Sequence, residues 1–180
     1  MSSFYSEDEL KSIGFKNCGK NVLISRKASI YSPEKIEIGD NVRVDDFALL
    51  SGTIIIGNYV HIAAYAALFS GEKIIELKDY VGVSSRSTIY SQTDDYSGEY
   101  MTNPTVPDKY KNVKKQEVVL EKHALVGASC VVLPGVVIGE GTSVGAMSLI
   151  NKSLDKWSIY AGVPCKKIKN RTKRLLEFEK

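Results

Sequence analysis

Aliphatic side chains recur every six residues along most of this chain. The longest ladder consists of Leu120, Val126, Val132, Ile138, Val144 and Ile150. A second consists of Ile38, Val44, Leu50, Ile56, Ile62 and Leu68, and a shorter one of Leu77, Val83 and Ile89. An amphipathic helix repeats at three and four residues and a half-buried strand at two, so neither produces a period of six. The period instead predicts short strands separated by tight corners.

Small or β-branched companions follow most ladder positions by four residues. In the longest ladder they are Ala124, Cys130, Val136, Thr142 and Ser148. If both positions point inward, three strands close one triangular turn, and each turn buries the core of its neighbour. We expect roughly six to seven stacked turns between Val22 and Leu154.

Two segments near the C-terminus carry a family resemblance. Val126–Ser148 reads VGASCVVLPGVVIGEGTSVGAMS, and Ile159–Ile168 reads IYAGVPCKKI. Both resemble the hexapeptide-repeat acyltransferase family, which includes maltose, galactoside and other sugar O- and N-acetyltransferases. The resemblance covers about residues 20 to 170. It implies an all-β fold, namely a left-handed parallel β-helix with short terminal helices. It also implies a homotrimer with active sites at the subunit boundaries and acetyl-CoA as the co-substrate.

The chain is expected to divide into three parts. Residues 1–20 cap the open end of the solenoid, with Ser6 and Glu9 forming a capping box. Residues 21–155 form the β-helix, and residues 156–180 form an exit loop and a C-terminal helix. The ladder breaks at about residues 92–117, where Pro104, Pro107 and several tyrosines stand. A loop this long is usually functional or disordered. We interpret it as an arm that reaches a neighbouring subunit or the acceptor site, with a floppy insertion as the alternative.

Composition and net charge limit the kinds of binding partner that we expect for this chain. The net charge is only +3, and no apolar run approaches the roughly 18 residues of a membrane helix, so we expect no nucleic acid and no membrane span. The N-terminus lacks a signal pattern, which favours a cytoplasmic protein. Three scattered cysteines indicate no metal knuckle, and no metal is expected. Basic residues dominate from Lys152 to Arg174, which favours a phosphate-bearing ligand, with a solvated tail as the alternative.

Acyl transfer to a hydroxyl needs a group that removes a proton, and histidine is the usual choice. The chain has two histidines, His61 and His123. His61 follows an inward position, so its side chain should leave the solenoid, whereas His123 is expected at a solvated corner. The YVHIA segment around His61 resembles family members that acetylate nucleotide-linked amino sugars, in which this histidine contacts the acetyl donor. The maltose and galactoside branch carries its catalytic histidine where this chain has Asp94. We therefore take His61 and Asp94 as the candidate catalytic residues, with a surface or subunit-contact role as the alternative for His61.

Binding residues are predicted on two segments. Arg86 is a candidate for a phosphate of a sugar nucleotide. Asp95 and Tyr96 are candidates for the acceptor, although loop aspartates often serve only the turn. The family resemblance implies that the CoA arm follows the C-terminal turns, where the matched residues are Gly127, Ala128, Gly145, Ala146, Ser148, Ala161, Pro164, Lys166 and Lys167.

These features predict an acetyl-CoA-dependent acetyltransferase. Its acceptor would be the hydroxyl or amine of a sugar or nucleotide-linked amino sugar, in surface-polysaccharide biosynthesis. Two alternatives stay open: a non-enzymatic solenoid scaffold, and an acetyltransferase for another small acceptor such as an antibiotic. A zinc carbonic anhydrase of the same fold needs three histidine ligands, and this chain has two histidines.

Overall fold

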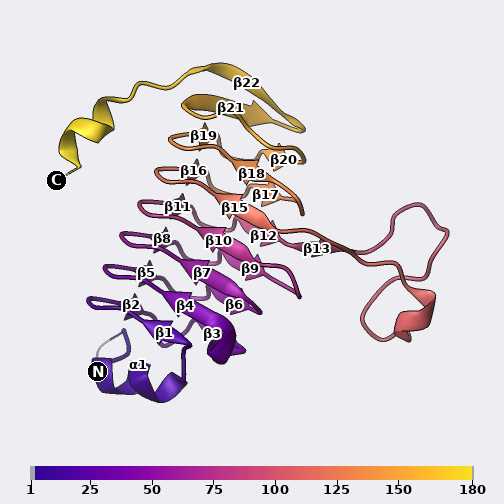
Figure 1. Ribbon diagram of the computed structural model, residues 1–180, viewed down its shortest axis with the longest axis horizontal. Helices are drawn as coiled ribbons and strands as arrows, with labels where there is room; N and C mark the ends of the chain where they lie inside the picture. Colours follow the sequence, from indigo (N-terminus) through magenta and orange to yellow (C-terminus); the bar gives the residue numbers. More distant parts are fainter. Residues whose placement is uncertain (1–2, 180) are drawn as a thin grey trace.

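A stack of short parallel strands forms the body of the protein (Figure 1). The computed structural model describes residues 3–179, and these form a β-solenoid of about seven turns. The expected parallel β-helix of hexapeptide repeats is therefore confirmed. Each complete turn contributes one strand to each of three sheets, and tight corners join the strands.

Three sheets make the three sides of the solenoid. The first sheet contains β1 (Asn17–Cys18), β4 (Ile36–Ile38), β7 (Ile54–Ile56), β10 (Ile75–Leu77), β15 (Val118–Leu120) and β18 (Val137–Ile138). The second contains β2 (Leu23–Ile24), β5 (Arg43–Val44), β8 (His61–Ile62), β11 (Gly82–Val83), β16 (Leu125–Val126), β19 (Ser143–Val144), β21 (Ser158–Gly162) and β22 (Cys165–Asn170). The third contains β3 (Ser29–Tyr31), β6 (Leu49–Ser51), β9 (Ala67–Phe69), β12 (Thr88–Tyr90), β17 (Val131–Val132) and β20 (Leu149–Ile150).

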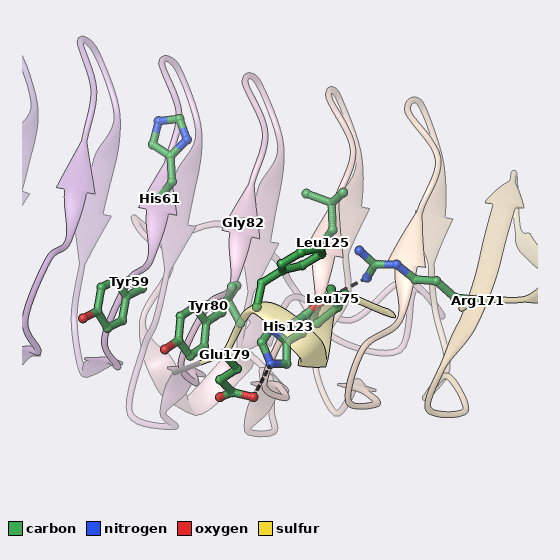
Figure 2. Close-up of a pocket in the computed structure, with 12 residues that line it drawn as sticks. Tyr59, His61, Tyr80, Gly82, His123, Leu125, Arg171, Leu175 and Glu179 are labelled. Carbon is green, nitrogen blue, oxygen red and sulfur yellow. Dashed lines mark hydrogen bonds and ion pairs between the residues drawn. The ribbon is translucent and has the colours of Figure 1, made fainter. Parts of the chain in front are cut away.

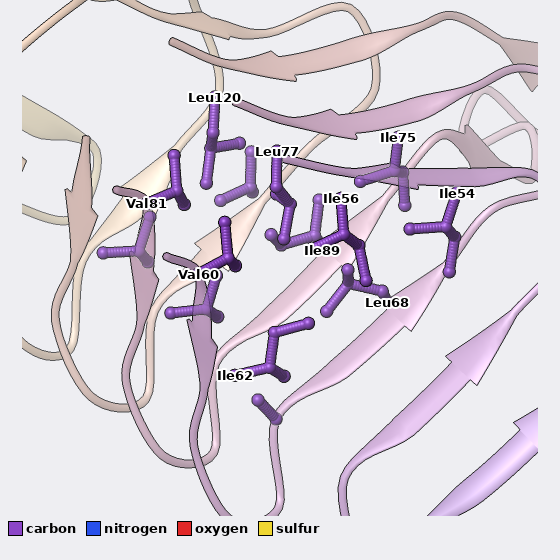
Figure 3. Close-up of a cluster of buried hydrophobic side chains, with 14 of the residues drawn as sticks. Ile54, Ile56, Val60, Ile62, Leu68, Ile75, Leu77, Val81, Ile89 and Leu120 are labelled. Carbon is purple, nitrogen blue, oxygen red and sulfur yellow. The ribbon is translucent and has the colours of Figure 1, made fainter. Parts of the chain in front are cut away.

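The ladder residues fill the interior of the coil (Figure 3). In each strand the ladder residue points inward and its neighbour outward, because successive side chains of a strand alternate between faces. Val126, for example, is 0% exposed, whereas Leu125 beside it is 40% exposed. The companions are buried as well, including Ala124 and Cys130. Burying one Leu, Ile or Val side chain stabilises a fold by about 1.5–3 kcal/mol, so this stripe is the main source of stability.

The corners contain a feature that the six-residue period does not reveal. Residues other than glycine adopt left-handed backbone there, among them Tyr59, Tyr80, His123 and Trp157 with φ of 58, 60, 61 and 53°. The rings of the first three stack from turn to turn, with centroids 4.9 Å apart for Tyr59–Tyr80 and for Tyr80–His123, and the Trp157 ring is tilted against His123. Left-handed backbone costs roughly 1–2 kcal/mol per residue, and stacked aromatic pairs return about 0.5–1.5 kcal/mol each.

The N-terminal end of the coil is covered by α1 (Glu7–Ile13). Ser6 accepts from the backbone N–H of Glu9, and the Glu9 carboxylate accepts from that of Ser6, so the predicted capping box is present. Leu10 on this helix is 5% exposed and joins the core. A short 3₁₀ helix, η1 (Pro33–Lys35), interrupts one corner. Strand pairing extends from β1 to β22, beyond both ends of the expected residues 21–155.

Two segments leave the coil (Figure 1). The ladder break forms an arm whose base is the antiparallel pair β13 (Gln92–Thr93) and β14 (Lys114–Lys115), with η2 (Asp108–Tyr110) inside it. The C-terminal tail follows β22, which runs antiparallel to β21. Of the exit loop and C-terminal helix expected over residues 156–180, the part described, up to residue 179, has one helical segment, η3 (Arg174–Phe178), which is a 3₁₀ turn. Strands β21 and β22 occupy most of the segment before it.

Candidate active site

His61 belongs to an outward row of side chains on the second sheet. In register, the row reads Arg43, His61, Gly82, Leu125 and Ser143. The His61 side chain is 52% exposed and leaves the solenoid as expected, because Ile62 after it points into the core. His61 lines a groove together with Gly82 and Leu125 (Figure 2).

A carboxylate fixes the orientation of the His61 ring. His61 Nε2 lies 2.7 Å from Asp45 Oδ2, and Arg43 Nε donates to Asp45 Oδ1 at 2.7 Å. Burial by itself would raise the pKa of Asp45, but the hydrogen bonds from His61 and Arg43 outweigh it and hold that pKa below its usual value. Asp45 is therefore ionised at neutral pH.

A second row, made of small side chains, runs beside His61 along the next corner. It consists of Ala63, Ser84, Gly127, Gly145 and Ala161, at equivalent positions of five successive turns. The backbone N–H groups of Ala63 and Ser84 bond to the turn above, each at 2.9 Å. Ser84 stands one turn above His61 and two residues further along, so strand geometry places the two Cα atoms about 8 Å apart. We call this set the small-residue row.

Close packing of the coil requires glycine at position 127 of this row and leaves little room for a side chain at position 145. A Cβ on Gly127 would lie 2.6 Å from Ala146 N, and one on Gly145 would lie 3.1 Å from Ala161 Cβ. Ala128 and Ala146 directly follow these glycines, so the structure brings these predicted CoA positions together. With no large side chain in the way, a long thin ligand can approach the backbone here.

The remaining predicted CoA residues fall into two groups. Ser148 is 2% exposed, and its hydroxyl donates to Gly145 O at 2.7 Å and accepts from Gly162 N at 3.0 Å. Its side chain is therefore buried within the coil and does not face a ligand on the surface. Pro164, Lys166 and Lys167 are exposed on the hairpin of β21 and β22. Lys166 pairs with Ala161 in that hairpin, which places both lysines at the C-terminal end of the small-residue row.

Asp94 lies in a different groove, of about 700 Å³, between the arm and the third sheet. Phe69 and Tyr90 form part of its wall, with stacked rings whose centroids are 5.4 Å apart. Asp94 Oδ2 accepts from the backbone N–H of Asn103 at 3.2 Å, which ties the carboxylate to the arm. We call this cavity the arm groove.

The three predicted acceptor residues do not form one cluster. Asp95 is 9% exposed, and its Oδ2 accepts from Ser97 N at 3.0 Å and from Ser97 Oγ at 2.6 Å, so it serves the turn. Tyr96 is 91% exposed and borders the arm groove. Arg86 stands at a corner of the coil, with Cζ 5.8 Å from the ring centroid of Tyr65.

His123 lies at a corner of the coil as expected, but the expectation that this corner is solvated is wrong. Its side chain is only 9% exposed, because the C-terminal tail returns across it (Figure 2). His123 Nε2 lies 3.3 Å from Glu179 Oε2, its ring stacks on Tyr80, and Arg171 donates to its carbonyl oxygen at 3.2 Å. No local pattern announces a contact between residues so far apart in the sequence.

One chain does not bring the two catalytic candidates together. His61 lines the groove on the second sheet, whereas Asp94 lines the arm groove on the third. Sequence reasoning missed Asp45 and Ser84, although a signal existed. Each directly follows a ladder residue, Val44 or Val83, and so occupies the same outward corner position as Gly127.

Among residues 3–179, no group of three His, Cys, Asp or Glu side chains could hold a metal ion. In the same residues, no helix has both the length and the apolar character needed to cross a bilayer.

Known proteins resemble this chain over nearly its whole length. A family model described as bacterial transferase hexapeptide (six repeats) matches residues 117–152. Over 180 residues the chain is 42% identical to dTDP-4-amino-4,6-dideoxy-D-glucose acyltransferase of Escherichia coli, covering 98% of this chain and 93% of that protein. It is 28% identical over 162 residues to the putative lipopolysaccharide biosynthesis O-acetyl transferase WbbJ of Escherichia coli K12, covering 87% and 80%.

Solved structures give a similar result. The N-acyltransferase AntD of Bacillus cereus superposes with a TM-score of 0.98 at 55% identity, covering 99% of this chain and 96% of that one. AntD has been solved with dTDP and coenzyme A, with dTDP and 3-hydroxybutyryl-CoA, and with dTDP-4-amino-4,6-dideoxyglucose and coenzyme A. The AntD variants among these structures are D94A, D94N, S84A, S84C and S84T.

Proposed function

Because this chain belongs to the hexapeptide-repeat acyltransferases, we propose that it transfers an acyl group from an acyl-CoA to the 4-amino group of a dTDP-linked 4-amino-4,6-dideoxyglucose. The observation that carries the proposal is the likeness over nearly the whole chain to two acyltransferases of such substrates. N-acylation is favoured over O-acylation, since both of those relatives are named for an amino sugar or an N-acyltransferase reaction. Acetyl-CoA is the simplest donor.

The reaction needs little help from a strong base. The amine nitrogen attacks the thioester carbonyl, a C–N bond forms, and the C–S bond breaks as the CoA thiolate leaves. After the attack the nitrogen is cationic and therefore acidic, so a carboxylate is basic enough to take its proton. The departing sulfur then gains a proton, and the products are an amide and free CoA thiol.

We assign the proton acceptor to Asp94. This chain has an aspartate and a serine at the two numbers varied in AntD, Asp94 and Ser84. Ser84 belongs to the small-residue row, beside the groove that His61 lines. We assign the Ser84 hydroxyl and His61 to hydrogen bonds with the acceptor, so that the role of His61 is to orient it.

This assignment requires a second copy of the chain. Asp94 directly follows β13 at the base of the arm that projects from the coil, and it lines the arm groove, whereas Ser84 directly follows β11 on the second sheet (Figure 1). A homotrimer in which the arm of one subunit reaches the second sheet of its neighbour would bring Asp94, Ser84 and His61 to one centre. Exposed arm residues such as Tyr96 and Tyr110 would then find partners across the boundary. Sedimentation should accordingly show a trimer at micromolar concentration, and a monomer alone would contradict this assembly.

The donor fits the C-terminal half of the coil. The pantetheine arm would follow the small-residue row, from Ala161 toward Ser84, and its amides would meet exposed backbone there. Lys166 and Lys167 at the end of that row would receive phosphate oxygens. We place the enzyme in the cytoplasm, where CoA and nucleotide sugars are found, and in the supply of modified sugars for a surface polysaccharide.

The proposal is tested by following thiol release from acetyl-CoA. dTDP-4-amino-4,6-dideoxyglucose is the acceptor, and dTDP-glucose, which has a hydroxyl in place of the amine, is the matched control. Thiol release with the amino sugar alone, together with a product heavier by one acetyl group, is the expected result. Equal release with dTDP-glucose would indicate O-acylation, and no release with any sugar nucleotide would sink the proposal.

A further inference from the structure

Asp45 has no role in the proposed reaction, yet it makes a close polar contact with His61. The carboxylate sits 18% exposed between two cationic or polar partners. His61 Nε2 approaches one oxygen at 2.7 Å, and Arg43 Nε donates to the other at 2.7 Å. Both oxygens are thereby committed, and the carboxylate cannot rotate without losing one bond.

The backbone fixes Asp45 equally well. Its N–H donates to Ile62 O at 3.0 Å, so Asp45 is locked to the turn that carries His61. Arg43 is held as well, with its guanidinium carbon 5.3 Å from the ring centroid of Phe4. The contacts Phe4–Arg43–Asp45–His61 therefore form a continuous chain, in which the Asp45 side chain is 18% exposed and the side chains of Arg43 and His61 are about half exposed.

An ionised carboxylate next to a neutral imidazole selects one tautomer. Asp45 can only accept, so the proton of neutral His61 must be on Nε2. Nδ1 is then left with a lone pair, and within residues 3–179 it takes no hydrogen bond. Gly82, the next residue in the outward row, has no side chain to fill the space beside the ring.

We propose that Asp45 is a positioning residue that holds His61 as the Nε2–H tautomer, so that Nδ1 accepts a hydrogen bond from the acceptor sugar. This inference rests on the proposed function, because it takes the acceptor to bind beside Ser84. It makes Asp45 act only through His61. The adjacent carboxylate, Asp46, has other partners, since its oxygens accept hydrogen bonds from Ser25 Oγ at 2.5 Å and from Lys27 Nζ at 3.0 Å.

A double-mutant cycle separates positioning from a merely structural effect. Affinity for dTDP-4-amino-4,6-dideoxyglucose would be measured by calorimetry without CoA in wild type, Asp45→Ala, His61→Ala and the double variant. Loss of one oriented hydrogen bond should weaken binding by about five- to tenfold in either single variant. If Asp45 acts through His61, the double variant binds no worse than His61→Ala. Asp46→Ala is the control and should show no coupling to His61.

A spectroscopic reading of the same variants does not depend on the substrate. In the NMR spectrum of protein with ¹⁵N-labelled histidine, the signals of His61 and His123 are assigned by recording the His123→Ala variant. The Nε2-bound proton of His61 should be protected in wild type and in Asp46→Ala, and should exchange freely in Asp45→Ala. Asp45→Asn keeps an acceptor oxygen and should restore part of the protection.

The two hypotheses fail in different ways. Wild-type protein that binds no dTDP-amino sugar and releases no thiol would refute the proposed function, whatever Asp45 does. If Asp45→Ala weakens binding to the same extent with and without His61, or leaves the His61 N–H signal unchanged, the positioning role is overturned while the proposed function stands.

Discussion

Asp94→Asn is the substitution that tests the proposed chemistry most directly. Asparagine keeps the shape of the side chain and an oxygen that can accept from Asn103 N, the 3.2 Å contact that ties Asp94 to the arm. Asp94 is half-buried, and an isosteric substitution that keeps this contact is expected to change stability by no more than about 0.5 kcal/mol, so the arm should fold as before. What is lost is the ability to accept a proton at neutral pH.

The size of the effect follows from the role. Removing a positioned general base typically lowers the rate by about 10²–10⁴-fold, which corresponds to about 2.7–5.4 kcal/mol of activation free energy at 1.36 kcal/mol per decade. His61→Ala removes an orienting hydrogen bond instead, and should lower kcat/KM for the acceptor by about tenfold. Neither change removes core volume, since the His61 side chain is 52% exposed and Ile62 keeps its place in the core.

The assay is the initial rate of thiol release at saturating acetyl-CoA, with the oligomeric state of each variant checked by sedimentation. We expect Asp94→Asn to be far slower than His61→Ala at equal trimer content. If Asp94→Asn stays within about threefold of wild type while His61→Ala falls a hundredfold, then His61 is the base and the role given to Asp94 is wrong.

Three further outcomes are expected. The hydrogen bonds from Arg26 and from the backbone of Ser6 lower the pKa of Glu9 to about 2, so the stabilisation by this carboxylate should be complete above its ordinary pKa of 4.5 and lost as the pH falls toward 2. In urea unfolding, Glu9→Gln should therefore reduce the difference in the free energy of unfolding between pH 6 and pH 3. An unchanged difference would contradict this prediction. Replacing Lys166 and Lys167 with Glu should weaken CoA binding by about tenfold at low salt and less at high salt, whereas unchanged calorimetric affinity would make the basic segment a solvated tail. His123→Ala should keep turnover near wild type yet lower the free energy of unfolding by about 1–2 kcal/mol in urea, because a buried stacked ring is lost; full stability would show that the tail does not pack on it.

The six-residue repeat in the sequence is by itself enough to predict most of the fold. A six-residue aliphatic ladder leaves few alternatives, because each short strand can bury one side only by closing a triangular turn against its neighbours. The ladder predicts that Leu120, Val126 and Val132 point into the interior, and all three are fully buried. The capping box at Ser6 was equally readable, because its contacts span three residues.

Tertiary structure decided everything that depends on which turns lie side by side. Asp45 and His61 are 16 residues apart, and only the stacking of successive turns brings their side chains to 2.7 Å. Glu179, in the tail that covers His123, lies 56 residues further along the sequence, and no periodicity encodes the return of the tail to this corner. A ladder specifies which side of a strand faces inward. The pairing of outward residues instead depends on the number of residues in each corner and loop, which sets the register between turns.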